Sequence, residues 1–180
     1  VNKLERASEL DHDDTRGLFY LGSCLELASR ETGRADYFDA AVAAFERLLR
    51  IDPQDAYALN YLGYMFADGG TRLDKAVELL TRAVSLDPNN SAFLDSLGWA
   101  YFRSGDVERA NHFMARALTE MEVEDDQEAS AADQAIIFDH AGDIAHALGD
   151  ISRAVTHWTR ALELAPENQD LKDKLVIEAP

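Results

Sequence analysis

Residues 91–105 read SAFLDSLGWAYFRSG, and residues 56–70 read AYALNYLGYMFADGG. Both contain Leu-x-x-Leu-Gly-x-x followed by an aromatic residue, and their glycines are 35 positions apart. Each is followed by a second apolar stretch with a small residue at a fixed point, Ala76 or Ala110, and these alanines are 34 positions apart. Apolar residues spaced by three and four predict amphipathic helices, so we expect a repeated helix–turn–helix unit of about 34 residues.

Two further copies of the pattern carry their glycine at Gly22 and Gly142. We expect each repeated glycine to lie where the two helices of a unit cross, because a side chain there would force them apart. Asp-Pro at 52–53 and at 87–88 predicts a helix end, since the residue before proline disfavours the helical conformation. The first unit has 19 positions between its glycine and its small alanine, against 12 in the third, which predicts longer helices or a longer loop.

These four in-phase copies resemble the tetratricopeptide repeat family, and the resemblance covers essentially the whole chain. It implies an all-α fold, a right-handed superhelical solenoid of stacked antiparallel helix pairs. It also implies a scaffold or adaptor that binds a peptide or protein segment, with no enzymatic activity, no metal and no cofactor. The chain looks like the C-terminal part of a longer bacterial protein of this family.

The spacing between the copies divides the single solenoid into parts. The opening LERASELD at 4–11 matches LTRAVSLD at 80–87, the end of a second helix, so the chain is expected to begin inside a repeat. Thr71 and Asp106 are predicted to cap the second helices of their units. The predicted parts are the second helix of a truncated repeat at 1–12, repeats at 13–53, 54–88, 89–121 and 131–166, an acidic insert at 122–130, and a capping helix with a tail at 167–180.

The chain has 34 acidic and 17 basic residues, a formal net charge of −17. Nucleic acids and anionic membranes are bound through basic patches, so we expect neither as a partner. A basic protein or peptide agrees with the charge. Adaptation to a salt-rich habitat is the alternative, because Asp exceeds Glu and Arg exceeds Lys. No apolar run approaches the roughly 18 residues of a membrane helix, so we predict no direct membrane insertion and leave both the cytoplasm and attachment to the cell envelope open.

Stacked first helices line the concave face of such a solenoid, and the positions that face it can be counted from each glycine. The positions six and three before the glycine, and one, four and five after it, are expected to face the groove. Glu26, Ala92 and Ile136 lie at such positions. The residues predicted to bind a peptide are Arg16, Phe19, Tyr57, Asn60, Tyr64, Asp95, Trp99, Phe102, Arg103, Asp139 and Asp143.

These residue types suit recognition of a protein segment. Aromatic side chains with a polar edge are enriched at binding hot spots. Asn60 is expected to bond to a peptide backbone, and the three aspartates favour a basic ligand. The alternative for the aromatic residues is packing against neighbouring helices, and we expect Trp99 and Phe102 to be the most buried of them.

Some members of the family grip the C-terminal carboxylates of chaperones with Lys, Arg and Asn side chains on this face. Here the face offers only Arg16, Arg103 and Asn60, among several carboxylates. We therefore predict that the chain is not a chaperone carboxylate-clamp module and that an acidic C-terminal peptide does not bind.

Two other functions stay open as alternatives. Asp139, Asp143 and His146 lie at i, i+4 and i+7 on one helical face, whereas His140 is expected to point elsewhere. Zinc and manganese accept carboxylate and imidazole ligands, so these three residues define an alternative metal-binding or metal-dependent module. The other alternative is an assembly scaffold that acts through its ends or its convex face.

Overall fold

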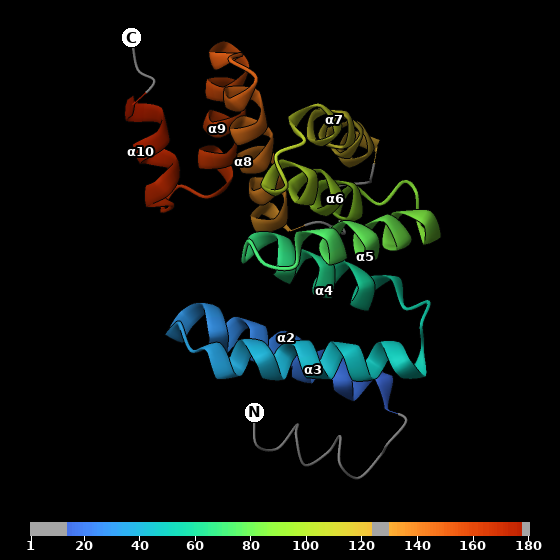
Figure 1. Cartoon of the computed structure of the whole chain (residues 1–180). Coiled ribbons are helices and arrows are strands. Elements are labelled where there is room, and N and C mark those ends of the chain that lie inside the picture. Colours follow the sequence, from blue (N-terminus) through green and yellow to red (C-terminus); the bar gives the residue numbers. More distant parts are fainter. Residues whose placement is uncertain (1–13, 124–129, 178–180) are drawn as a thin grey trace.

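The computed structural model describes residues 14–123 and 130–177, and within them the chain is a succession of helix pairs (Figure 1). The helices are α2 (Thr15–Thr32), α3 (Ala35–Ile51), α4 (Ala56–Asp68), α5 (Leu73–Leu86), α6 (Ser91–Arg103), α7 (Val107–Val123), α8 (Ala131–Ala147), α9 (Ile151–Leu164) and α10 (Gln169–Ile177). Helix α2 packs on α3, α4 on α5, α6 on α7 and α8 on α9, while α10 packs on α9. The predicted all-α solenoid of stacked helix pairs is confirmed. None of these helices is long and apolar enough to span a membrane.

First helices of successive pairs also touch one another. Helix α4 contacts α6, and α6 contacts α8. The first helices therefore form a layer of their own, which any groove shared by several pairs must use.

Four predicted segments fall wholly or partly outside the described residues, and for two of them, 13–53 and 167–180, only residue 13 and residues 178–180 do so. The predicted second helix of a truncated repeat, 1–12, lies outside them, and so do residues 124–129 of the predicted acidic insert at 122–130. Glu122 and Val123 belong to α7. Ser130 caps α8, where its hydroxyl oxygen accepts a hydrogen bond from the Asp133 N–H at 3.2 Å. The two ends of the predicted insert thus belong to the helices on either side.

The two helices of a pair cross at the repeated glycine. A Cβ atom added at Gly142 would lie 2.3 Å from the indole ring of Trp158, and one at Gly22 would lie 2.7 Å from the ring of Phe45. Packed protein interiors do not tolerate such short separations, so a larger residue would push the helices apart. The predicted role of these two glycines at the helix crossings is confirmed.

Of the two caps predicted for second helices, one is confirmed and one is wrong. The Asp106 carboxylate accepts a hydrogen bond from the Arg109 N–H at 3.0 Å and caps α7, as predicted. Thr71 does not cap α5, so that prediction is wrong. Arg72 holds the cap position with a φ of 48° and makes no side-chain cap hydrogen bond. The chain leaves the preceding double-glycine turn in the left-handed region, which delays the helix by one residue, and the Arg72 guanidinium lies 4.9 Å from the centroid of the Phe66 ring.

The first pair is longer than the second. Helices α2 and α3 contain 18 and 17 residues, whereas α4 and α5 contain 13 and 14. Gly33 ends α2 with a φ of 67°, and its N–H donates to the Ser29 carbonyl at 2.8 Å. Because α3 begins two residues after this glycine, the additional residues of the first unit lengthen its helices and leave its loop short.

Two of the turns between pairs form a hydrogen bond with the second helix of the following pair. Arg82 of α5 donates to the Pro53 carbonyl at 2.6 Å, and Arg116 of α7 donates to the Pro88 carbonyl at 2.8 Å. The two arginines are 34 positions apart, so this hydrogen bond recurs with the repeat. At the other end of the stack, Leu171 of α10 is 1% exposed and completes the core between α8 and α9.

Candidate functional site

The first helices of four successive pairs line an open pocket of about 260 Å³, which we call the central pocket. It lies in the layer formed by α2, α4, α6 and α8. Its lining residues are Glu26 and Arg30 of α2, Asn60, Tyr61, Tyr64 and Met65 of α4, Ala92, Asp95 and Ser96 of α6, and Asp133, Ile136 and Ile137 of α8.

Counting from the repeated glycines brings several predicted residues to this pocket. Asn60, Tyr64 and Asp95 line it, and so do Glu26 and Ile136, which occupy equivalent positions on α2 and α8. These five residues come from four helices that are far apart in sequence. The stacking of the pairs is therefore what brings them together.

Three other predicted residues gather at a second depression beside the first. Arg16, Phe19 and Tyr57 line it together with Tyr20, and the exposed fractions of Tyr20 and Tyr57 are 57% and 59%. The Phe19 ring meets the Tyr61 ring edge-on at a centroid distance of 5.2 Å. Because Tyr61 lines the central pocket, the two depressions adjoin.

Two of the residues predicted to face the groove are almost completely buried. Trp99 is 8% exposed and Asp95 is 4% exposed. The Trp99 ring stacks on Phe102 at 5.2 Å, and the Arg103 guanidinium lies 5.5 Å from its centroid. Arg103 also donates to the Asp68 carbonyl at 2.6 Å. Trp99 is therefore a packing residue under the groove, as the packing alternative anticipates, and Arg103 is held by the preceding first helix.

His140 of α8 is the partner of Asp95. Its Nδ1 atom lies 3.0 and 3.1 Å from the two carboxylate oxygens, and both side chains are buried. The imidazole also stacks on Trp99 with a centroid separation of 4.0 Å. Burial works to lower the pKa of His140, but the Asp95 carboxylate outweighs it, so the pKa of His140 is raised.

Sequence reasoning set His140 aside and missed this contact. His140 lies two positions before the repeated glycine of its unit, where the two preceding units have Ser96 and Tyr61. Both of those residues line the central pocket. The position two before the glycine therefore points toward the neighbouring first helix, and this is the signal that would have found His140.

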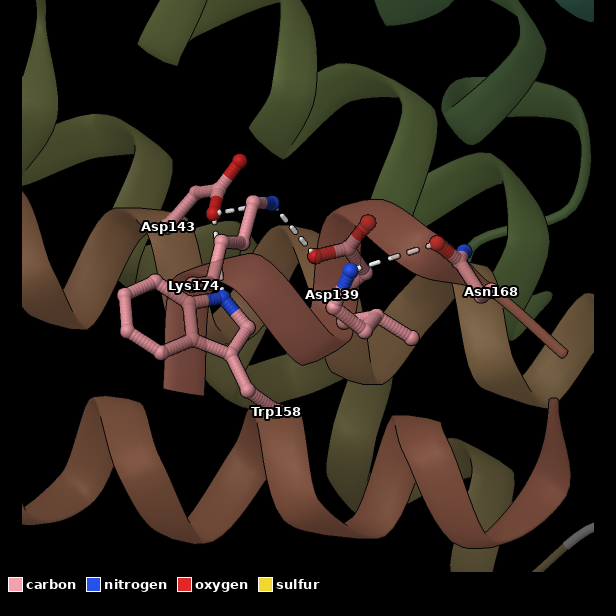
Figure 2. Close-up of polar contacts among 6 residues, drawn as sticks. Asp139, Asp143, Trp158, Asn168 and Lys174 are labelled. Atoms are coloured by element: carbon pink, nitrogen blue, oxygen red, sulfur yellow. Dashed lines mark hydrogen bonds and ion pairs between the residues drawn. The ribbon is translucent and has the colours of Figure 1, made fainter. Parts of the chain in front are cut away.

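Asp139 and Asp143, predicted to attract a basic ligand, hold a lysine of the chain itself. Figure 2 shows Lys174 of α10 reaching between the two carboxylates, with its Nζ atom 2.6 Å from an oxygen of each. Trp158 Nε1–H donates to Asp143 at 3.0 Å, and the Lys174 ammonium lies 5.6 Å from the Trp158 ring centroid. Burial works to lower the pKa of Lys174, but its hydrogen bonds to both carboxylates raise it above its usual value.

The alternative metal site does not assemble. The Lys174 ammonium occupies the oxygens of Asp139 and Asp143 that a cation would need. The His146 ring lies 5.5 Å from Trp158, the same indole that donates to Asp143. Within residues 14–123 and 130–177, no group of three or more His, Cys, Asp or Glu side chains is arranged to hold a metal ion.

The walls of the central pocket carry a negative field. Burial raises the pKa of Tyr64, and the carboxylates of Asp68 and Asp95 add to the rise. Burial also raises the pKa of Tyr61, with the Glu26 carboxylate as the next cause. Ionisation of these phenols is disfavoured chiefly because they are buried, and also because acidic groups from several helices lie nearby.

The comparisons with known proteins agree on one family. The tetratricopeptide repeat family model matches residues 30–91 and 69–129. A TPR repeat-containing protein of Pseudomonas aeruginosa is 41% identical over 81 residues, which are 43% of this chain and 14% of that protein. A probable UDP-N-acetylglucosamine–peptide N-acetylglucosaminyltransferase, SPINDLY of Solanum lycopersicum, is 33% identical over 85 residues, 47% of this chain and 8% of that protein. The matched regions are thus a small part of both relatives.

Several solved structures share this fold. The APC/C hetero-tetramer Cut9–Hcn1 superposes with a TM-score of 0.82 at 16% identity, over 97% of this chain and 32% of that one. MamA from Desulfovibrio magneticus superposes with a TM-score of 0.65 at 21% identity, over 92% of this chain and 84% of that one. The first TPR domain of Spaghetti (RPAP3), bound to an HSP90 peptide, superposes with a TM-score of 0.58 at 23% identity, over 71% of this chain and 93% of that one. At these identities the likeness shows the fold.

Proposed function

Because the chain belongs to the tetratricopeptide repeat family, we propose that it is a non-catalytic module that binds a segment of a partner protein along its first helices. The fold generally serves protein–protein interaction, and one structural neighbour is bound to a peptide. Such a module acts as a scaffold or adaptor within a larger protein or assembly.

The central pocket is the observation that supports this proposal. It spans four helix pairs, and exposed apolar side chains border the same layer of helices. Leu27 is 55% exposed, Ile136 38% and Tyr61 37%. Apolar and aromatic side chains around a concave site are typical anchors of protein interfaces. A segment laid across the first helices would cover these side chains and enter the pocket.

The chemistry of the groove favours binding over catalysis. The two titratable pairs next to it, His140 with Asp95 and Lys174 with Asp139, are engaged in joining helices. A catalytic group must instead be free to reach a substrate. The similarity to the SPINDLY transferase covers 8% of that enzyme and gives no support for transferase activity in this chain.

Affinity capture with two matched variants tests the proposal. Ile136 lines the central pocket, whereas Ile151 begins α9, and both side chains are 38% exposed. We expect wild type and Ile151→Arg to retain the same protein from a native extract, and Ile136→Arg to lose it, after equal helicity and melting have been checked for all three. If all three retain the same proteins, binding occurs at the ends or the convex face and the proposal is wrong.

A further inference from the structure

Three carboxylates from three different helices line the central pocket together with Tyr61 and Tyr64. They are Glu26 of α2, Asp95 of α6 and Asp133 of α8, so no single helix creates the cluster. Burial raises the pKa of both tyrosines, and nearby carboxylates add to the rise.

Only part of this negative charge is balanced inside the protein. Asp95 is paired with His140. Arg30 also lines the pocket and lies 3.6 Å from Glu26 of its own helix, with its side chain 58% exposed. Asp133 accepts a hydrogen bond from the Ser130 hydroxyl and lies at the pocket wall. Three carboxylates are thus set against one buried imidazole and one mostly exposed guanidinium, so an additional cation is favoured.

The pocket also has features that an acidic cluster alone would lack. Tyr64, Met65 and Ile137 give it apolar walls. The Oδ1 atom of Asn60 is buried and has no hydrogen-bond partner among the described residues. A buried acceptor without a donor is costly, and Asn60 lines the pocket, so rotation of its side chain toward an N–H group of a ligand would be favourable. An apolar stem that ends in a cationic N–H donor satisfies both features.

The size of the pocket suits one side chain. Its volume is about 260 Å³. Pockets for drug-sized molecules generally measure about 300–1,000 Å³. The pocket lies just below that range and has room for a long side chain that enters from a segment lying across the helices.

The chain itself shows how this face binds a basic side chain. Lys174 lies between Asp139 and Asp143 and above the Trp158 ring. Asp139 is three positions before its repeated glycine and Asp143 is one after it. In the second unit those two positions hold Asn60 and Tyr64, which line the central pocket. At equivalent positions two helix pairs further along the stack, acceptors and an aromatic ring thus already surround a cation.

From this geometry we infer that the central pocket receives the side chain of one lysine or arginine from the bound partner, held by Glu26, Asn60 and the tyrosine walls. The inference rests on the proposed function, because the side chain must arrive on a segment bound along the first helices. The partner is accordingly a protein with a basic residue in an extended stretch, and the pocket sets the register in which that stretch binds.

Selection from a phage-displayed library of random linear peptides tests the inference on the full chain. Selected peptides are synthesised, and their affinities for wild type and variants are measured by fluorescence anisotropy. We expect them to share one Lys or Arg, and its replacement by Gln to weaken binding by about tenfold or more. Glu26→Gln should weaken binding of the parent peptide to a similar extent, and should have little further effect on the Gln-substituted peptide.

A second glutamate provides the control. Glu78 on α5 pairs with Lys75 in its own helix and lies outside the pocket, so Glu78→Gln removes the same charge and should leave affinity unchanged. Peptides that lack a basic residue but lose binding to Ile136→Arg would overturn the inference and preserve the proposed groove. Peptides indifferent to both Glu26→Gln and Ile136→Arg, or a selection that yields none, would overturn both.

Discussion

The imidazole ring of His140 lies parallel to the indole ring of Trp99, with centroids 4.0 Å apart and planes that differ by 10°. The same imidazole bonds to Asp95, so two side chains of α6 hold one side chain of α8. Helices α6 and α8 each supply residues to the central pocket. This buried contact therefore fixes two of its walls relative to one another.

Stability is expected to depend on pH through His140. The pKa of His140 is raised in the folded protein. Its contribution to the free energy of unfolding is therefore complete below the unfolded-state pKa near 6.5, and it is lost as the pH rises through the folded-state pKa. We predict that the free energy of unfolding of wild type falls with rising pH relative to His140→Gln. Urea unfolding of both proteins across a pH series measures the difference. His157, whose pKa is lowered chiefly by burial, acts in the opposite direction but is common to both. Parallel pH profiles would contradict the prediction.

Gly142→Ala is expected to destabilise the fold by about 1–3 kcal/mol, because the new methyl group must displace the Trp158 ring. Thermal or chemical unfolding measures this loss. Thr159→Ala, at an exposed position on α9, should change stability by less than about 0.5 kcal/mol. An unchanged stability of Gly142→Ala would mean that α8 and α9 can separate at little cost.

Lys174→Ala is expected to loosen α10. Without the ammonium, the carboxylates of Asp139 and Asp143 repel each other in a site about one quarter exposed, which should cost about 1–2 kcal/mol. Hydrogen exchange should accelerate at the amides of α10. Lys172→Ala removes the same charge from the same helix and leaves the hydrogen bonds from Lys174 to Asp139 and Asp143 in place, so it should have little effect. Equal exchange in the two variants would show that the bridge does not hold the helix.

The HSP90 peptide SRMEEVD, which the first TPR domain of RPAP3 binds, is expected not to bind here. The groove is rich in carboxylates, and Arg103 already donates to the Asp68 carbonyl. Calorimetric titration of the chain with this peptide should give no heat of binding. A micromolar dissociation constant would contradict the prediction and would also remove the electrostatic basis for a basic partner.

The repeat pattern predicted the fold because its glycines act locally. Gly22 and Gly142 each face a large aromatic ring of the second helix in the same unit. The need for a small residue there is therefore set by residues within about twenty positions in the sequence. Positions counted from those glycines also located Asn60 and Tyr64 at the central pocket.

Other parts of the site depend on how the pairs stack, which the motif does not specify. His140 and Asp95 are 45 positions apart and meet because adjacent first helices touch. Lys174 reaches Asp139 from a helix that carries no copy of the motif. Which side of a first helix faces its neighbour, and which faces open space, follows from the rotation between pairs, so Trp99 was predicted on the surface and lies beneath it.

The recurring hydrogen bonds from Arg82 to Pro53 and from Arg116 to Pro88 bear on the mechanics of the stack. Each bond links the turn between two pairs to the second helix of the following pair. We expect these links to restrain movement at the two turns and so to limit changes in the width of the groove before a ligand arrives. A rigid receptor loses little conformational entropy on binding, so more of the contact energy is expressed as affinity.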